Sequence, residues 1–494
     1  MTRRIFAFLV FALSLCFAAP GYAQHTVSST FFGSQWNHVA ANGSQPTPWC
    51  PQDGNSVTAT LTSFRVWDDN MKWDQIETAS GTYSWGVLDE AVNNLIATPG
   101  CLMSMIYTVG ATPEWATACN GSADPGTCLP GPTGSGFGGG TQCSSPDDWS
   151  CLPPSDIAAD GTGTDAQFQN FIGNVMLRYP NLISYYELGN EFDSPNFSCS
   201  TSSVAACGSS SAQIARAIRM GWDARKLAGC YSPNSKILSP SFHVGTALTW
   251  FDTYNTTSIS APAGNITIAS HTCSWSAQSV TGKMVWDYPN EHMRGTTGTN
   301  SDPASVIAAY NNLHTEMANL GLSPACYFND EWGLNGGQSP NIATTASYLA
   351  ASLVLQTSFS NPPICSENWY QWDNGDYVAS QTIVGTANDV VAGWLVGATV
   401  NNYSLSGTVY TVTGTKGGAA FEILFDDFGT CSGTTISTCS TTNESAGTFS
   451  TYTDLTGTSH SISGGVAPVG FAPVMLSGVG TGPMIPQLIA RSHP

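Results

Sequence analysis

The feature of the sequence that most constrains the fold is an alternation of short apolar runs and helical patterns between about residues 28 and 375. Helical segments lie between most of the apolar runs, as expected for the strands of a parallel sheet. The eight candidate strands are 30–36, 63–67, 102–109, 183–188, 237–241, 266–270, 326–329 and 364–369. Eight such units close most economically into an α/β fold of the (β/α)8 type, a TIM barrel. The alternative, an open doubly wound sheet, is disfavoured because no glycine-rich dinucleotide fingerprint follows the first strand.

The clearest helical pattern covers residues 303–320. Its apolar residues recur at steps of four and three and therefore share one face. They are Val306, Tyr310, Leu313, Met317 and Leu320. Pro303 suits the first helical position and Gly321 suits the end. The pattern therefore predicts an amphipathic helix that packs on the sheet, and a second one is expected at about 165–179.

The pattern changes after about residue 385. Segments such as GTVYTVTG and FSTYTDLTG alternate apolar and polar residues between Gly, Asn and Thr turns. Such alternation is typical of short antiparallel strands with one buried face. We therefore expect a catalytic barrel over residues 24–384 and a smaller antiparallel β-sandwich domain over residues 385–494.

Residues 1–23 have the pattern of an export signal. Two arginines precede an apolar run of about a dozen residues, and a small-residue site ends at Ala23. A membrane anchor is the alternative, but the run is short for a span. No later stretch is long and apolar enough to cross a bilayer. The chain is therefore expected to be secreted or periplasmic, with its oligomeric state open.

The cysteine count fits export. The chain has 15 cysteines, and removal of Cys16 with the signal leaves an even number, so several disulfides are expected. Close pairs that could join loop ends are Cys119/Cys128, Cys143/Cys151, Cys199/Cys207 and Cys431/Cys439. Because no zinc-type Cys/His cluster is present, no metal site and no cofactor are expected.

The charge balance narrows the range of partners. The formal net charge is −20 and the pI is near 4.4. Such a charge disfavours nucleic acid and anionic membranes as partners. It suits a neutral ligand.

Two glutamates stand where barrel enzymes place their catalytic groups, at the carboxyl ends of strands. Glu191 follows the fourth strand in ELGNEFD, and Glu331 ends the seventh in YFNDEWG. Paired carboxylates across a cleft are what glycoside hydrolysis requires. Arg65 on the second strand is well placed to keep one carboxylate ionised. The loop 111–165 follows the third strand and is long enough to be functional.

These residues carry a family resemblance. The NE pair after the fourth strand, NDEWG after the seventh, and Arg65 resemble the clan A glycoside hydrolases, the large retaining (β/α)8 group. WDQIETASGTYSWGVLDEAV, followed by VGATPEWA, is most similar to family 39 and its relatives, while NDEWG also resembles family 51 arabinofuranosidases. The resemblance covers most of the chain from about residue 30. It implies that Glu191 is the general acid/base and Glu331 the nucleophile, with the carboxyl groups about 5–5.5 Å apart.

Further residues are expected to bind the substrate, which the resemblance implies is carbohydrate. Asn190 can hydrogen-bond a sugar hydroxyl next to the reacting carbon. Trp369 or Trp372 can offer a flat face to a sugar ring, and His271 ends the sixth candidate strand. The segment SHTCSW lacks the tyrosine that is common in the families it resembles, and Tyr288 is expected to supply that phenolic hydroxyl.

The resulting prediction is a retaining hydrolase of β-linked glucan, xylan or mannan. An exo-acting β-xylosidase or α-L-arabinofuranosidase is an alternative reading. A carbohydrate-binding protein without activity is another.

Overall fold

A computed structural model describes eleven stretches of the chain. They are residues 24–36, 61–67, 71–97, 103–117, 152–191, 210–242, 247–293, 303–333, 341–370, 382–427 and 431–479.

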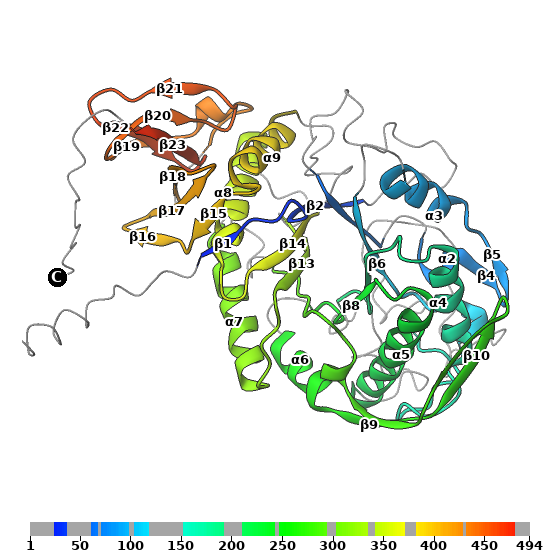
Figure 1. Ribbon diagram of the computed structural model, residues 1–494. Coiled ribbons are helices and arrows are strands. Elements are labelled where there is room, and N and C mark those ends of the chain that lie inside the picture. Colours follow the sequence, from blue (N-terminus) through cyan, green and yellow to red (C-terminus); the bar gives the residue numbers. More distant parts are fainter. Residues whose placement is uncertain are drawn as a thin grey trace, which may run out of the picture.

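The centre of the molecule is a curled parallel sheet (Figure 1). Within the described residues it has seven strands in the order β13-β14-β2-β3-β6-β7-β8. Their bounds are β2 Phe32–Trp36, β3 Ser63–Val66, β6 Ser104–Thr108, β7 Tyr185–Glu187, β8 Lys236–Leu238, β13 Tyr327–Trp332 and β14 Ile364–Trp369. All four residues of β3 and all six of β13 are buried, as expected for parallel strands covered on both faces.

Residues 288–291 close the sheet. Tyr288 forms a parallel bridge with Leu238 of β8, and Asn290 forms one with Phe328 of β13. The backbone N–H of Phe328 also donates to the carbonyl of Pro289 at 3.0 Å. This segment therefore occupies the sixth strand position, and the barrel predicted from the sequence is confirmed.

The residues assigned to the sixth strand were wrong. Residues 264–275 form an antiparallel hairpin outside the barrel, with β10 (Gly264–Ile268) paired to β11 (His271–Trp275). Alternate side chains of β10 are exposed, whereas a barrel strand is buried on both faces. Ala269 and Ser270 adopt positive φ angles and turn the chain between the two strands.

Helices surround the barrel (Figure 1). Their bounds are α2 Trp73–Ile76, α3 Gly86–Ala91, α4 Ala166–Arg178, α5 Ser210–Tyr231, α6 Ala247–Thr256, α7 Ser305–Asn319, α8 Ile342–Ser358 and α9 Thr382–Leu395. A π-helical turn covers Val92–Ala97, and 3-10 turns cover Glu114–Ala116, Gly282–Met284 and Ile436–Thr438. Short ribbons pair β4 (Glu77–Ala79) with β5 (Thr82–Tyr83), and β9 (Ser258–Ala261) with β12 (Gln278–Thr281). The predicted stripe of α7 is buried at Val306, Tyr310, Leu313 and Met317.

An antiparallel sheet follows the barrel, as the sequence predicts. Its strand order is β1-β15-β17-β18-β23-β20-β21, with β16 also paired to β17 and a separate two-stranded ribbon of β19 and β22. The bounds are β1 Gln24–Thr26, β15 Thr399–Asn401, β16 Ser404–Ser406, β17 Val409–Lys416, β18 Ala419–Asp426, β19 Thr441–Ser445, β20 Phe449–Thr453, β21 Ser459–Ser461, β22 Val466–Gly470 and β23 Val474–Val479. A small apolar core that includes Leu424, Val469 and Leu476 lies between the sheet and the ribbon.

The first described strand belongs to this C-terminal sheet. Gln24 lies opposite Asn401 in the register of β1 and β15. The first described residues therefore belong to the C-terminal sheet, and the chain enters the barrel at β2. One apolar core also runs from barrel residues such as Phe64 to sheet residues such as Val412.

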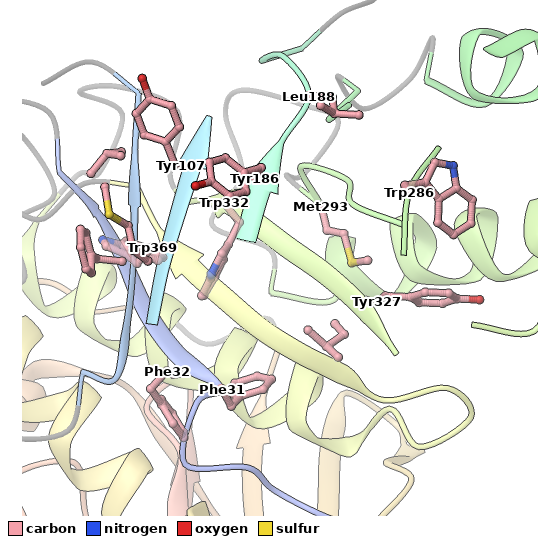
Figure 2. Packing of buried hydrophobic residues seen from close by; sticks show 14 of the residues in the cluster. Phe31, Phe32, Tyr107, Tyr186, Leu188, Trp286, Met293, Tyr327, Trp332 and Trp369 are labelled. Carbon is pink, nitrogen blue, oxygen red and sulfur yellow. The ribbon is translucent and has the colours of Figure 1, made fainter. Parts of the chain in front are cut away.

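Large aromatic side chains pack in the main apolar core that the sheet shares with its helices (Figure 2). Trp332 and Trp369, at the ends of β13 and β14, pack edge to face with ring centroids 4.7 Å apart. Tyr107 and Tyr186 make a similar contact at 6.2 Å. This packing gives the strand ends a rigid base.

Three disulfides join cysteines of the described residues. The predicted pair Cys431–Cys439 is confirmed, and Cys230–Cys273 and Cys326–Cys365 join more distant positions. The other three predicted pairs, Cys119/Cys128, Cys143/Cys151 and Cys199/Cys207, involve residues outside the described stretches. Among the helices that the structure describes, none is both long and apolar enough to cross a bilayer.

Candidate active site

The centre of the candidate site is the fully buried guanidinium of Arg65 on β3. It donates to both oxygens of Glu187 at 2.8 and 3.1 Å and to Oε2 of Glu331 at 2.6 Å. It also donates to Gln35 at 2.7 Å and to Oδ1 of Asn190 at 2.5 Å. Parallel pairing sets this arrangement, since Gln35 and Arg65 lie opposite each other in register. One cation thus fixes side chains from three strands, β2, β7 with its following turn, and β13.

His292 joins the two glutamates singled out in the sequence. Its Nδ1 lies 3.0 Å from Oε1 of Glu191, and its Nε2 lies 3.9 Å from Oε2 of Glu331. Nε2 is also 3.3 Å from Oδ1 of Asp330. The ring is fully buried and directly follows the segment that closes the barrel. It can therefore orient Glu191 through a hydrogen bond, whereas its 3.9 Å contact with Glu331 is electrostatic only.

Glu191 stands on a strained turn at the end of the fourth strand. Gly189 has a φ of 99°, and Glu191 itself has a φ of 41°, which is unfavourable for a residue with a side chain. The backbone N–H of Glu191 donates to the hydroxyl of Ser241 at 3.0 Å and holds the turn. Such strain persists where the surroundings fix it, commonly at functional sites. Glu191 and Glu331 are only 6% and 5% exposed, so both carboxyl groups are largely shielded from water.

Burial and nearby charges shift the pKa values of two neighbouring acids, Glu187 and Asp330, in opposite directions. Burial is the main cause that raises the pKa of Glu187 to about 7, and Arg65 offsets only part of this effect. Burial also opposes ionisation of Asp330, but the Arg65 charge and the His292 hydrogen bond outweigh it and lower the pKa of Asp330 to about 2. Burial would lower the pKa of His292, yet hydrogen bonds to Asp330 and Glu191 leave it raised. The cluster is therefore suited to hold and move protons near neutral pH.

Two triads of this cluster have the residue types of a metal site. They are Glu187, His292 and Asp330, and Glu191, His292 and Glu331, with the oxygen and nitrogen atoms of each triad within 4.8 Å of one another. The Arg65 guanidinium already bonds to Glu187 and Glu331, so a cation at either triad would meet positive charge. Acid–base chemistry fits this environment better than metal binding.

The structure brings together four of the predicted site residues: Arg65, Asn190, Glu191 and Glu331. Trp369 lies nearby, but its ring is 2% exposed and packs on Trp332 and Tyr348. Trp372 lies outside the described residues.

Two predicted site residues need correction. His271 is exposed on the β10–β11 hairpin, outside the barrel, so it does not line the site. Tyr288 packs against Tyr185 and Phe328 inside the barrel. It lies at the start of the closing segment, four residues before His292, and so packs in the barrel core instead of reaching the cluster.

Sequence reasoning missed His292 because the sixth strand was placed too early. The signal was present. In a strand–helix unit, the sixth strand should end shortly before the helix at 303–320. The apolar run nearest to that helix is MVWDY at 284–288. Polar residues after that run include His292.

A small cavity adjoins the cluster. Its volume is about 80 Å³, and its lining includes Trp67, Asn190 and Arg216. Leu152 and Pro153, near the end of the loop that the sequence marked as functional, form part of one wall. The described end of this loop therefore lies at the catalytic face of the barrel.

Several solved structures to which this chain is similar are glycoside hydrolases. A family 39 glycoside hydrolase from the gut symbiont Bacteroides cellulosilyticus WH2 matches with a TM-score of 0.56 and 14% identity, over 92% of this chain and 82% of that chain. This chain therefore shares the overall fold of that enzyme. A family 30 endoxylanase from Clostridium papyrosolvens C71 matches with a TM-score of 0.51 and 10% identity, over 93% and 98% of the two chains. A family 39 enzyme from Xanthomonas axonopodis pv. citri matches with a TM-score of 0.50 and 10% identity, over 93% and 96%.

No protein-family model and no curated protein matches the chain. At 10–14% identity, the likeness to the solved structures concerns the fold. The resemblance seen in the sequence is confirmed at that level. Activity and substrate must be argued from the site itself.

We expect the stability of the protein to fall as the pH rises through 7, and Glu187→Gln to reduce this dependence. The folded-state pKa of Glu187 is raised from 4.5 to about 7, so its contribution to stability is complete below pH 4.5 and is lost as the pH rises through 7. This contribution is on the order of 1–3 kcal/mol. His292, with its raised pKa, acts in the same direction. Melting temperatures of both proteins from pH 4 to 9 check the expectation, and parallel curves would contradict it.

Proposed function

We propose that the protein is a retaining glycoside hydrolase that cleaves β-linked poly- or oligosaccharides by double displacement. The observation that carries the proposal is the spacing of the two glutamates at the catalytic face. One carboxylate oxygen of Glu191 and one of Glu331 lie within 4.8 Å of each other and of a nitrogen of His292, so the two carboxyl groups are close neighbours. Retaining enzymes hold the two carboxyl groups at about 5–5.5 Å, whereas inverting enzymes leave about 6.5–9.5 Å for a water molecule.

Glu331 acts as the nucleophile in this proposal. The Arg65 guanidinium lies 2.6 Å from its Oε2 and favours the ionised carboxylate. The carboxylate attacks the anomeric carbon as the bond from that carbon to the leaving oxygen breaks, and a covalent glycosyl ester forms. Arg65 also holds Asn190, which is placed to bond a sugar hydroxyl beside the reacting carbon.

Glu191 acts as the general acid and then as the general base. It first gives its proton to the departing glycosidic oxygen, and it later takes a proton from the water that attacks the ester. Formation of the ester removes the negative charge of Glu331 from the neighbourhood of Glu191, which favours the ionised form needed for the second step. His292, 3.0 Å from Oε1, keeps the carboxyl group oriented through both steps.

The substrate class follows from charge and compartment. A net charge of −20 repels polyanions and leaves neutral glucan, xylan or mannan as the favoured polymers. The predicted export signal at residues 1–23 and three disulfides fit work on a polymer outside the cytoplasm.

Product analysis tests the proposal. Defined β-glucans, xylans and mannans are incubated with the protein, the first anomer formed is identified by proton NMR, and the products are sized. We expect a β-configured first product, and the product sizes separate endo from exo attack. An α-configured first product would overturn the retaining mechanism, and intact polymers and aryl glycosides throughout the screen would overturn the hydrolase assignment.

We expect His292→Ala to lower kcat for aryl glycoside hydrolysis by roughly 10²- to 10³-fold. The ring contacts Glu191 and lies near Glu331, so its loss releases the orientation of Glu191 and removes an electrostatic contact of Glu331. The alkaline limb of the pH–rate profile should also move, because the pKa of His292 is raised in the folded protein. His460→Ala, in the C-terminal sheet, is the matched control. Equal rates for the two variants would remove His292 from the mechanism.

A further inference from the structure

A second concavity lies where the barrel meets the C-terminal sheet, and we name it the junction crevice. Its volume is about 440 Å³. It is formed by α7, the loop from α8 to β14, and the residues around β16. The loop precedes β14, whereas the catalytic groups follow the strands, so the crevice lies at the opposite end of the barrel from the catalytic face. Its volume falls within the range of pockets that hold small molecules.

Aromatic rings form a rigid part of the crevice. Tyr310 and Phe359 are stacked with centroids 4.1 Å apart and an interplanar angle of 16°. Tyr403 meets Phe359 edge to face at 6.3 Å and is only half-buried. Tyr310 and Phe359 are only 7% and 4% exposed and stack on each other, so they form a fixed base rather than a free ring face. The half-buried ring of Tyr403 is the apolar surface that remains for the C–H face of a sugar ring.

The polar groups of the crevice are amides. Asn311, Asn361 and Asn402 all line it and are all exposed. Asn402 accepts a hydrogen bond from the hydroxyl of Ser360 at 2.5 Å through its amide oxygen. A primary amide offers donors and an acceptor side by side, and adjacent sugar hydroxyls offer the same combination.

The crevice carries no formal charge. None of the described residues that line it is acidic or basic. A charged ligand would lose hydration there without gaining an ionic partner. The lining therefore favours a neutral ligand with both hydroxyl groups and apolar faces.

We propose that the junction crevice is a non-catalytic binding site for a neutral saccharide unit of a polysaccharide chain. It would tether the protein to a polymer while the catalytic face remains free. The inference rests on the proposed function only for the choice of polymers to test, because binding here needs neither Glu191 nor Glu331.

The test measures binding with a protein that does not hydrolyse the polymer. Full-length Glu331→Gln protein is run in native gels that contain barley β-glucan, xylan or galactomannan, and its retardation is compared with the same protein carrying Asn311→Ala and Asn361→Ala. We expect the loss of two amides to weaken the affinity for at least one polymer by roughly tenfold. Both positions are exposed, so the substitutions leave the packing of the protein intact.

Asn312→Ala is the matched control. Asn312 is exposed on the same helix but does not line the crevice, and we expect its variant to bind like its parent. The crevice substitutions in the active protein should leave aryl glycoside hydrolysis unchanged, which separates this site from the catalytic one. The proposal is overturned if the crevice variant is retarded as strongly as its parent on every polymer, or if the parent is retarded on none. Neither result bears on whether Glu331 is the nucleophile.

Discussion

Glu331→Gln is expected to lower kcat for aryl glycoside hydrolysis by about 10⁴-fold or more. The amide is uncharged and a poor nucleophile, so the glycosyl ester no longer forms. Its volume matches that of the carboxylate, and its oxygen can still accept a hydrogen bond from Arg65, which lies 2.6 Å from Glu331 in the parent protein. Stability should therefore change little while activity is lost. Initial rates and melting temperatures measured on the same preparations check both expectations.

The matched control is Glu422→Gln on β18, which makes the same chemical change in the C-terminal sheet. We expect this variant to keep the parental kcat, since β18 belongs to the antiparallel sheet and not to the barrel. If Glu331→Gln hydrolysed aryl glycosides as fast as Glu422→Gln, another group would have to be the nucleophile.

Arg65→Met is expected to destabilise the folded protein by about 3–5 kcal/mol. Methionine removes the charge and cannot donate to Glu187 or Glu331, and Asp330 loses a cation at 3.2 Å. All three carboxyl groups are buried, so they must take up protons or remain charged without a counterion. Thermal or denaturant unfolding measures the change. We expect activity to fall with stability, because the nucleophile then loses the charge that favours its ionised form.

Arg178→Met is the control for this substitution. Arg178 pairs with Asp89 at 2.5 Å, but its side chain is 40% exposed, so water already screens the pair. The cost there is expected to stay below about 1 kcal/mol. Equal destabilisation by the two substitutions would show that Arg65 contributes no more than a surface ion pair.

The barrel could be predicted because its signals are local. Strand–helix alternation, the stripe of α7 and the switch to alternating polarity after the barrel are properties of short windows of sequence. The exception was the sixth strand. Residues 264–275 have strand-like composition and do form strands, but they pair with each other in a hairpin. Which strands pair is decided by the tertiary structure. The sequence of one strand does not show whether it pairs with an adjacent segment or with a distant one.

The proximity of Glu191 and Glu331 was predictable for a related reason. A parallel barrel brings the carboxyl ends of its strands to one face, so Glu191 and Glu331 could be placed together once their strands were recognised. His292 was missed because residues 264–275 carry the stronger strand pattern, whereas residues 288–291 form only single bridges to β8 and β13. The apolar run at 284–288 was the weaker signal, and only the order of strand and helix pointed to it.

The sequence by itself determined the barrel, the antiparallel domain after it, and the four residues Arg65, Asn190, Glu191 and Glu331 as neighbours, because each follows from patterns within about ten residues and from the geometry of parallel strands. Only the tertiary structure decided that His292 bridges the glutamates, that Glu187 and Asp330 share Arg65, and that a crevice opens where the barrel meets the sheet. Those features depend on which segments, far apart in the chain, pack against one another. Their energies come from burial and from charges brought within a few ångströms, and neither is set until the chain has folded.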